Sequence, residues 1–356
     1  MTPEPPNAWL GRDYSMRAPR LTSREIRLAS RPRGMPLPAD FELAEVALAE
    51  PAEGEVLVRN VYMSVDPYMR GRMSDAPSYA APFDVGKVMA GGAVGKVLQS
   101  RAPELQAGDL VLSMLGWREQ FVAHAGSVQK LPAASVPLSA YLGILGLTGF
   151  TAWYGLNEIG RPKKGEWVAV SAAAGAVGSV AGQLARAHGC HVVGSAGSDD
   201  KVAHLVGDHG FEAAFNYHRL TPVEGFRRGA PEGIDVYFDN VGGAHLEAAI
   251  QHMRNFGRIV ACGSISRYNL TAPAPGPSNV SLIVGKRLLM QGFIIADHYS
   301  RLGEFRSQVI PMIERGQLRW RETILDGIER APEAFIKLFE GGNLGKMLVR
   351  LAPEAA

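Results

Sequence analysis

A turn of small residues, placed between an apolar strand and a helix, is the part of this sequence whose residue types point most directly to chemistry. Ala173, Gly175 and Gly178 occupy the three small positions of the dinucleotide-binding fingerprint, with alanine in place of the first glycine. Small residues there let backbone N–H groups contact a pyrophosphate, and the N-terminus of the following helix adds partial positive charge. The turn therefore predicts a dinucleotide site. A strand–helix–strand unit that binds no ligand is the alternative.

The segments on either side have the periodicity needed to hold this turn. Residues 167–170 are continuously apolar, as in a buried parallel strand, and residues 191–194 form a second strand-like run. Between them, apolar residues recur at helical spacing after the turn, at Val177, Val180, Ala181, Leu184 and Ala185. We therefore expect a Rossmann-type unit with the small-residue turn at the end of its first strand.

The residues after the second strand favour NADPH over NADH. Ser195 stands where an NAD-binding unit usually places Asp or Glu to hold the ribose hydroxyls. A carboxylate there would repel a 2′-phosphate, whereas a hydroxyl would not. Ser198 is expected to cap the next helix, so Lys201 falls in its first turn, where a cation opposes the helix dipole unless an anion is bound. A solvated surface lysine is the alternative interpretation of Lys201.

Composition limits the class of protein. The chain has 356 residues, 46% of them hydrophobic and 20% charged, which indicates a globular protein long enough for two domains. Its net charge of +2 gives no electrostatic reason to expect nucleic acid or an anionic membrane as a partner. We expect neither a membrane span nor a signal peptide. The two cysteines, Cys190 and Cys262, fit a reducing cytoplasm better than a disulfide framework.

The pattern along the chain divides it into four segments. Residues 1–22 bear prolines and arginines and are expected to form a loose extension. Residues 23–137 carry short strand-like runs with frequent glycines, which predict a β-barrel-like unit. Residues 138–305 alternate strands and helices, and residues 306–356 return to short elements that we expect to rejoin the first unit. The predicted fold class is α/β, with a barrel domain and a doubly wound parallel-sheet domain.

The motifs of this chain resemble those of the medium-chain dehydrogenase/reductase superfamily over nearly its whole length. The most specific match is residues 62–73, Tyr-Met-Ser-Val-Asp-Pro-Tyr-Met-Arg-Gly-Arg-Met. Within the superfamily, the chain looks most like the zinc-independent double-bond reductases, which include alkenal, prostaglandin and curcumin reductases. Supporting motifs lie at residues 172–178, 238–243, 262–269, 291–295 and 342–346. The resemblance implies a GroES-like domain, a Rossmann domain, an active cleft between them and a homodimer.

The resemblance also implies contacts with the phosphates of NADPH. Gly175, Ala176 and Val177 would line the pyrophosphate turn, next to Gly178 of the fingerprint. The adenosine-phosphate half of the cofactor would be held by Lys201 and Tyr217.

Four further residues are implied to surround the other half of the cofactor. Asn240 would lie beside a ribose, Cys262 and Phe293 would flank the nicotinamide, and Asn343 would reach it from the C-terminal segment. Tyr268 would face the substrate and is the first candidate for a proton donor.

Metal chemistry is not expected in this chain. Zinc-dependent relatives need Cys and His ligands in the catalytic site and four Cys in a structural site. Two cysteines cannot form the structural site, and residues 89–95 stand where a Gly-His-Glu motif would be, with both ligands replaced. Without a Lewis acid the substrate must be a carbonyl-activated alkene, because hydride transfer to it creates only an enolate.

These features predict NADPH-dependent reduction of the C=C bond of apolar α,β-unsaturated aldehydes and ketones, with hydride transfer to the β-carbon. Negative charge then grows on the carbonyl oxygen, so hydroxyl donors are expected nearby. Tyr268, Tyr62 and Tyr68 are the catalytic candidates, and Tyr268 or water would protonate the α-carbon. A packing role is the alternative for each tyrosine. Quinone reduction and non-catalytic NADPH binding remain the alternative functions.

Overall fold

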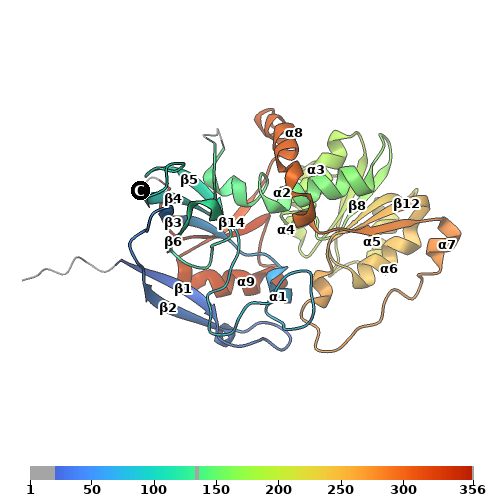
Figure 1. Ribbon diagram of the computed structural model, residues 1–356. Helices are drawn as coiled ribbons and strands as arrows, with labels where there is room; N and C mark the ends of the chain where they lie inside the picture. The colour runs from blue at the N-terminus through green and yellow to red at the C-terminus, as the bar shows by residue number, and fades with distance from the viewer. Residues whose placement is uncertain (1–20, 133–135, 355–356) are drawn as a thin grey trace, which may run out of the picture.

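Two large sheets lie side by side in the computed structural model (Figure 1). The structure describes residues 21–132 and 136–354, so nearly all of the predicted extension, residues 1–22, lies outside the described residues. Within the described ranges, one sheet has six strands and the other has seven. A separate antiparallel hairpin is formed by β1 (Thr22–Leu28) and β2 (Phe41–Ala47).

The six-stranded sheet is parallel throughout and carries the predicted nucleotide-binding unit. Alternate residues of its central strand enter different core clusters, Val168 and Val170 on one face and Trp167 and Ala169 on the other. Both faces are therefore buried, and the Rossmann-like doubly wound sheet is confirmed. The strand order is β10 (Ala213–Asn216), β9 (His191–Ala196), β8 (Trp167–Val170), β11 (Ile234–Asp239), β12 (Met253–Ala261) and β13 (Leu289–Gly292).

Helices cover both faces of this sheet (Figure 1). The Val168 face packs against α2 (Leu147–Tyr154), α3 (Gly178–Ala187), α4 (Asp199–Gly207) and α8 (Leu302–Glu314). The Trp167 face packs against α5 (Pro222–Gly229) and α6 (Gly243–His252), with α7 (Leu282–Lys286) at the edge. As predicted, Ser198 caps α4, its Oγ accepting a hydrogen bond from the Lys201 N–H at 3.3 Å. None of the helices that the structure describes is long and apolar enough to cross a membrane.

The seven-stranded sheet combines the two ends of the chain. Strand β15 (Lys346–Arg350) pairs antiparallel with β3 (Glu55–Ser64), so the red C-terminal elements lie among the blue N-terminal ones in Figure 1. The segment between β14 (Glu322–Asp326) and β15 contains α9 (Ala331–Phe339), whose Phe335 meets Trp117 edge to face. The strand order is β14 (Glu322–Asp326), β15 (Lys346–Arg350), β3 (Glu55–Ser64), β4 (Ala93–Ser100), β5 (Leu110–Ser113) and β7 (Val128–Lys130), with β6 (Gln120–His124) also on β3.

The closed β-barrel predicted for the N-terminal segment is not observed. Strand pairing among the described residues begins at β14 and ends at β7, and these two strands do not pair with each other. Repeated short strands with glycine turns predict strand pairing well, but closure depends on where the last strand meets the first, which such a pattern does not specify.

Candidate active site

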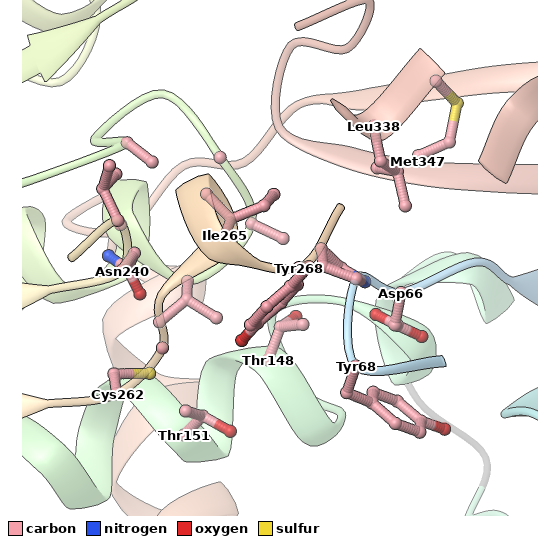
Figure 2. Close-up of a pocket in the computed structure, with 18 of the residues that line it drawn as sticks. Asp66, Tyr68, Thr148, Thr151, Asn240, Cys262, Ile265, Tyr268, Leu338 and Met347 are labelled. Carbon is pink, nitrogen blue, oxygen red and sulfur yellow. The ribbon is translucent and has the colours of Figure 1, made fainter. Parts of the chain in front are cut away.

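A cavity of about 1050 Å³ is lined by residues from both sheet regions. At one end its wall includes the small-residue turn after β8, and at the other end it includes the turn that follows β3. Figure 2 shows the latter end, with Asp66 and Tyr68 on one side and Asn240 and Cys262 on the other. The cavity is thus large enough for a dinucleotide and a further small molecule.

The small-residue turn has the geometry that its sequence predicts. Gly175, Ala176, Val177 and Gly178 all line the cavity. A Cβ atom at Gly178 would lie 2.5 Å from the carbonyl oxygen of Ala172, so no larger residue fits there. Helix α3 begins at Gly178 without a side-chain cap, an arrangement that leaves the helix N-terminus open to an anionic ligand.

Lys201 and Tyr217 lie on the wall of the same cavity. The Lys201 ammonium donates a hydrogen bond to the carbonyl oxygen of Gly341 at 2.8 Å. Burial lowers the pKa of Lys201, and no carboxylate among the described residues contributes to that shift. The nearby acid Asp199 pairs with Arg219 at 2.5 Å, so its charge is balanced. This end of the cavity therefore offers a cation whose partner is a neutral carbonyl.

The structure places Ser195 away from the position predicted for it. Its side chain is fully buried, its hydroxyl has no hydrogen-bond partner in the described part of the chain, and it is absent from the cavity wall. Successive strand residues point to opposite faces, so the wall is formed by the next residues, Ala196 and Gly197. Neither carries a carboxylate. The Tyr217 hydroxyl would lie 2.7 Å from a Cβ at Gly197, which keeps that position small.

Asn240 is fixed at the carboxyl ends of β8 and β11. Its backbone N–H donates to Ser171 Oγ at 2.9 Å, and its side-chain amide donates to the Ser171 carbonyl oxygen at 2.8 Å. The preceding residue, Asp239, is buried and accepts hydrogen bonds from the N–H groups of Val241 and Gly242 at 3.0 and 2.9 Å. Burial raises the pKa of Asp239, while these donors oppose the increase. Asp239 therefore shapes the turn that carries Asn240, a role that the sequence did not indicate.

Tyr268 reaches into the cavity from the loop after β12. In Figure 2 its ring crosses the cavity and its hydroxyl points toward the side where Cys262 and Thr151 lie. The Ser264 N–H donates to the Tyr268 oxygen at 3.4 Å. Burial raises the pKa of Tyr268, so the hydroxyl keeps its proton at neutral pH. Burial also raises the pKa of the Cys262 thiol to about 12, so Cys262 contributes a neutral surface.

The structure separates the other two candidate tyrosines. Tyr68 lines the cavity, and burial raises its pKa, with a further increase from the charge of Asp66. Tyr62 does not line the cavity; it lies in β3 opposite Arg350 and hydrogen-bonds to Glu354. The prediction of Tyr62 as a cavity residue is therefore wrong, because its side chain is buried in a core cluster and not in the cleft. The next residue of the motif, Met63, is fully buried in a core cluster and does not line the cavity either.

Phe293 and Asn343 both lie on the wall, as expected from the resemblance. The Asn343 amide donates to the carbonyl oxygen of Gly345 at 2.7 Å, which turns it toward its own loop. Several wall residues carried no signal in the sequence, because only the fold brings their segments to the cleft. They include Tyr79, Thr148, Thr151, His245 and Tyr299.

The described residues include no group of three His, Cys, Asp or Glu side chains that could hold a metal ion. The absence of metal remains a prediction that requires metal analysis.

Comparisons with known proteins match both parts of the chain. Residues 24–131 match a family model described as the N-terminal domain of oxidoreductase, and residues 176–315 match one described as zinc-binding dehydrogenase. The NADPH-dependent curcumin reductase of Escherichia coli (strain K12) is 43% identical over 91% of this chain and 96% of its own. The NADP(+)-dependent 2-alkenal reductase of Nicotiana tabacum is 41% identical over 95% of this chain and 100% of its own.

A solved structure agrees with these relatives. The crystal structure of CurA from Vibrio vulnificus in complex with NADPH matches with a TM-score of 0.88 and 42% identity, over 93% of this chain and 99% of that one. The chain therefore belongs to the medium-chain dehydrogenase/reductase family, and within it to the group that resembles these NADPH-dependent reductases.

Proposed function

We propose that this protein is an NADPH-dependent oxidoreductase that reduces the C=C bond of α,β-unsaturated aldehydes and ketones. The observation that carries the proposal is the continuity of one cavity from the small-residue turn at Gly175 to the Tyr268 hydroxyl. The relatives named 2-alkenal reductase and curcumin reductase, each more than 40% identical over most of the chain, support the same reaction class.

The residues present fit NADPH. The cradle at Gly178 would be filled by any Cβ, and the uncapped N-terminus of α3 suits a pyrophosphate. Lys201 supplies a cation for a 2′-phosphate, and the end of β9 carries no acid that would repel it. Asn240, Cys262, Phe293 and Asn343 would then hold the nicotinamide half.

NADPH, when bound, supplies a hydride to the β-carbon of the substrate. The chain's own groups act on the charge that this transfer creates at the carbonyl oxygen. Tyr268 is the donor best placed to stabilise that oxygen or to protonate the α-carbon, because its oxygen already accepts the Ser264 N–H and its own proton is free to be donated. Tyr68 is a second hydroxyl on the same wall.

An assay of substrate class tests this proposal. The purified protein is incubated with NADPH and trans-2-nonenal, with the saturated aldehyde nonanal, with benzoquinone, and with no acceptor. We expect NADPH oxidation with the enal, and a saturated aldehyde heavier than the substrate by two hydrogens. An alcohol product would favour carbonyl reduction, and turnover with the quinone alone would favour quinone reduction. Tight NADPH binding without turnover on any acceptor would favour a non-catalytic protein.

We also propose the domain division given by the sequence pattern: a GroES-like catalytic domain over 23–137, a Rossmann domain over 138–305, and a return to the first domain over 306–356. The pairing of β15 with β3 supports this division. The two free cysteines favour a cytoplasmic location.

A homodimer through β13 is the quaternary structure that we propose. This strand is the last in its sheet, and each of its residues is exposed. Val284 and Leu289 are 79% and 51% exposed, so apolar side chains accompany this open sheet edge. Sedimentation velocity should give a dimer, and Leu289→Lys combined with Met290→Lys should give a monomer. A wild-type monomer at micromolar concentration would refute the proposal.

A further inference from the structure

Arg70 is a buried cation that forms no ion pair with a carboxylate among the described residues. It lies in α1 (Met69–Arg72), directly after the cavity residue Tyr68, and is only 6% exposed. Burial lowers its pKa. Asp40 is the one carboxylate whose charge raises the pKa of Arg70. It accepts hydrogen bonds from the Ser30 hydroxyl at 2.6 Å and the Leu37 N–H at 2.8 Å. A buried guanidinium must therefore be satisfied by neutral acceptors.

The acceptors of Arg70 belong to two segments that are distant in sequence. Its guanidinium donates to the carbonyl oxygens of Pro32 at 3.1 Å and Gly34 at 2.9 Å, between β1 and β2. It also donates to Asn269 Oδ1 at 3.1 Å, 199 positions along the chain and next to Tyr268. Arg70 thus connects the N-terminal hairpin to the loop that carries the candidate proton donor.

The loop 264–275 is held at two further points. Arg267 donates to the carbonyl oxygens of Ala274 and Pro275, which ties the loop to itself. The Asn269 amide donates to Met35 Sδ at 3.1 Å, and a Cβ at Gly34 would lie 3.3 Å from the Thr271 side chain. The loop is therefore packed against the segment around Gly34, and Arg70 supplies the charged hydrogen bond of this contact.

We infer that Arg70 is a positioning residue for Tyr268, acting through Asn269. It fixes the backbone on the C-terminal side of Tyr268, while the Ser264 N–H holds the hydroxyl. The two contacts together keep the Tyr268 hydroxyl directed into the cleft. This inference rests on the proposed function, in which Tyr268 donates a hydrogen bond or a proton to the substrate.

Asn269→Ala tests the inference without removing the buried charge, since Arg70→Ala could prevent folding. We expect kcat with trans-2-nonenal to fall by about tenfold or more, as for loss of a hydrogen bond to a charged group, while KM for NADPH stays within about twofold. Asn269→Asp keeps an acceptor for Arg70 and should restore most of the rate. Asn269 itself lines the cavity, so its substitution could also act on the substrate directly. Asn157→Ala controls only for the loss of an amide elsewhere: its amide oxygen meets His188 at 2.9 Å, and it does not line the cavity.

A double-variant cycle with Tyr268→Phe decides the route of the effect. If Asn269 acts through Tyr268, adding Asn269→Ala to Tyr268→Phe should cost little further rate. Multiplicative losses would overturn the inference, as would an unchanged kcat for Asn269→Ala when Tyr268→Phe is impaired. Full activity of Tyr268→Phe would instead refute the donor role itself, and the inference with it.

Discussion

Replacing Lys201 with alanine should reduce the affinity of the protein for NADPH selectively. Lys201 lies on the cavity wall, its ammonium donates to a neutral carbonyl, and no acid among the described residues neutralises it. A 2′-phosphate placed there would gain a charged hydrogen bond that the free 2′-hydroxyl of NADH cannot match. The truncation therefore removes an interaction that only NADPH makes.

The expected size of this effect follows from the position of the lysine. A hydrogen bond to a charged group contributes about 1.5–3 kcal/mol, which corresponds to about 10- to 150-fold in affinity. Lys201 is half-buried, so solvent screens part of the attraction and the lower end of this range applies. We expect KM and Kd for NADPH to rise by about tenfold to thirtyfold, and those for NADH to change by less than about twofold.

Steady-state kinetics and fluorescence titration with both cofactors provide the measurement. Lys201→Arg should retain most of the preference because it keeps the charge. Ser195→Ala is an informative control: the Ser195 hydroxyl is buried without a partner, so its loss should leave the cofactor preference unchanged. Lys130→Ala removes an ion pair with Asp109 near the other sheet. It controls for the general effect of losing a lysine charge away from the cavity. Equal weakening of NADPH and NADH by Lys201→Ala would refute the reasoning.

Three other predictions concern the reaction, the metal and pH. Tyr268→Phe should lower kcat by about a hundredfold with the enal, as is typical for loss of a general acid; a loss confined to KM would point to water as the donor. Chelator treatment should leave activity intact, and metal analysis should find far less than one zinc per chain. The free energy of unfolding should fall as the pH drops from 6.5 to about 4, because burial lowers the pKa of His209 and of His245 from 6.5 to about 4 and the unfolded chain takes up protons that the folded chain excludes. Urea titrations at several pH values would measure this slope, and a flat profile would contradict it.

Local features of the nucleotide-binding unit could be predicted because they depend on residues close in sequence. The turn from Gly175 to Gly178, strand β8 and the Ser198 cap follow from small residues, apolar runs and a capping hydroxyl at fixed offsets. The same rules place Lys201 in the first turn of α4. None of these requires knowledge of what packs on the unit from elsewhere.

Predictions that needed the orientation of a side chain were less secure. Ser195 and Ala196 are adjacent, yet only Ala196 reaches the cavity, because a shift of one residue in a strand changes the face. Tyr62 lies in the same motif as Tyr68, but Tyr62 is within β3 with its side chain in a core cluster, while Tyr68 follows the end of the strand. A motif identifies the segment near a site, and the strand register decides which of its members face the ligand.

The remaining wall residues depend on contacts between distant segments. Thr148 and Thr151 of α2 belong to no motif that the sequence analysis identified, and they reach the cleft only after α2 has packed on its sheet. The role of the Asp239 side chain could not be predicted from the sequence either, because it accepts hydrogen bonds from N–H groups of its own turn.

Three cations share a feature that bears on cofactor binding: Lys201 and Lys346 line the cavity, and Arg70 lies two residues after the cavity residue Tyr68. Lys201 donates to the carbonyl of Gly341, Arg70 to those of Pro32 and Gly34, and Lys346 to that of Val65. Lys346 also pairs with Asp66 at 3.2 Å, but the other two hold their segments through neutral oxygens alone. An ammonium group has three N–H donors, so Lys201 can keep Gly341 and still bind a phosphate. In the proposed site, the Gly341 contact would orient Lys201 before a phosphate binds, which would reduce the entropy lost on binding.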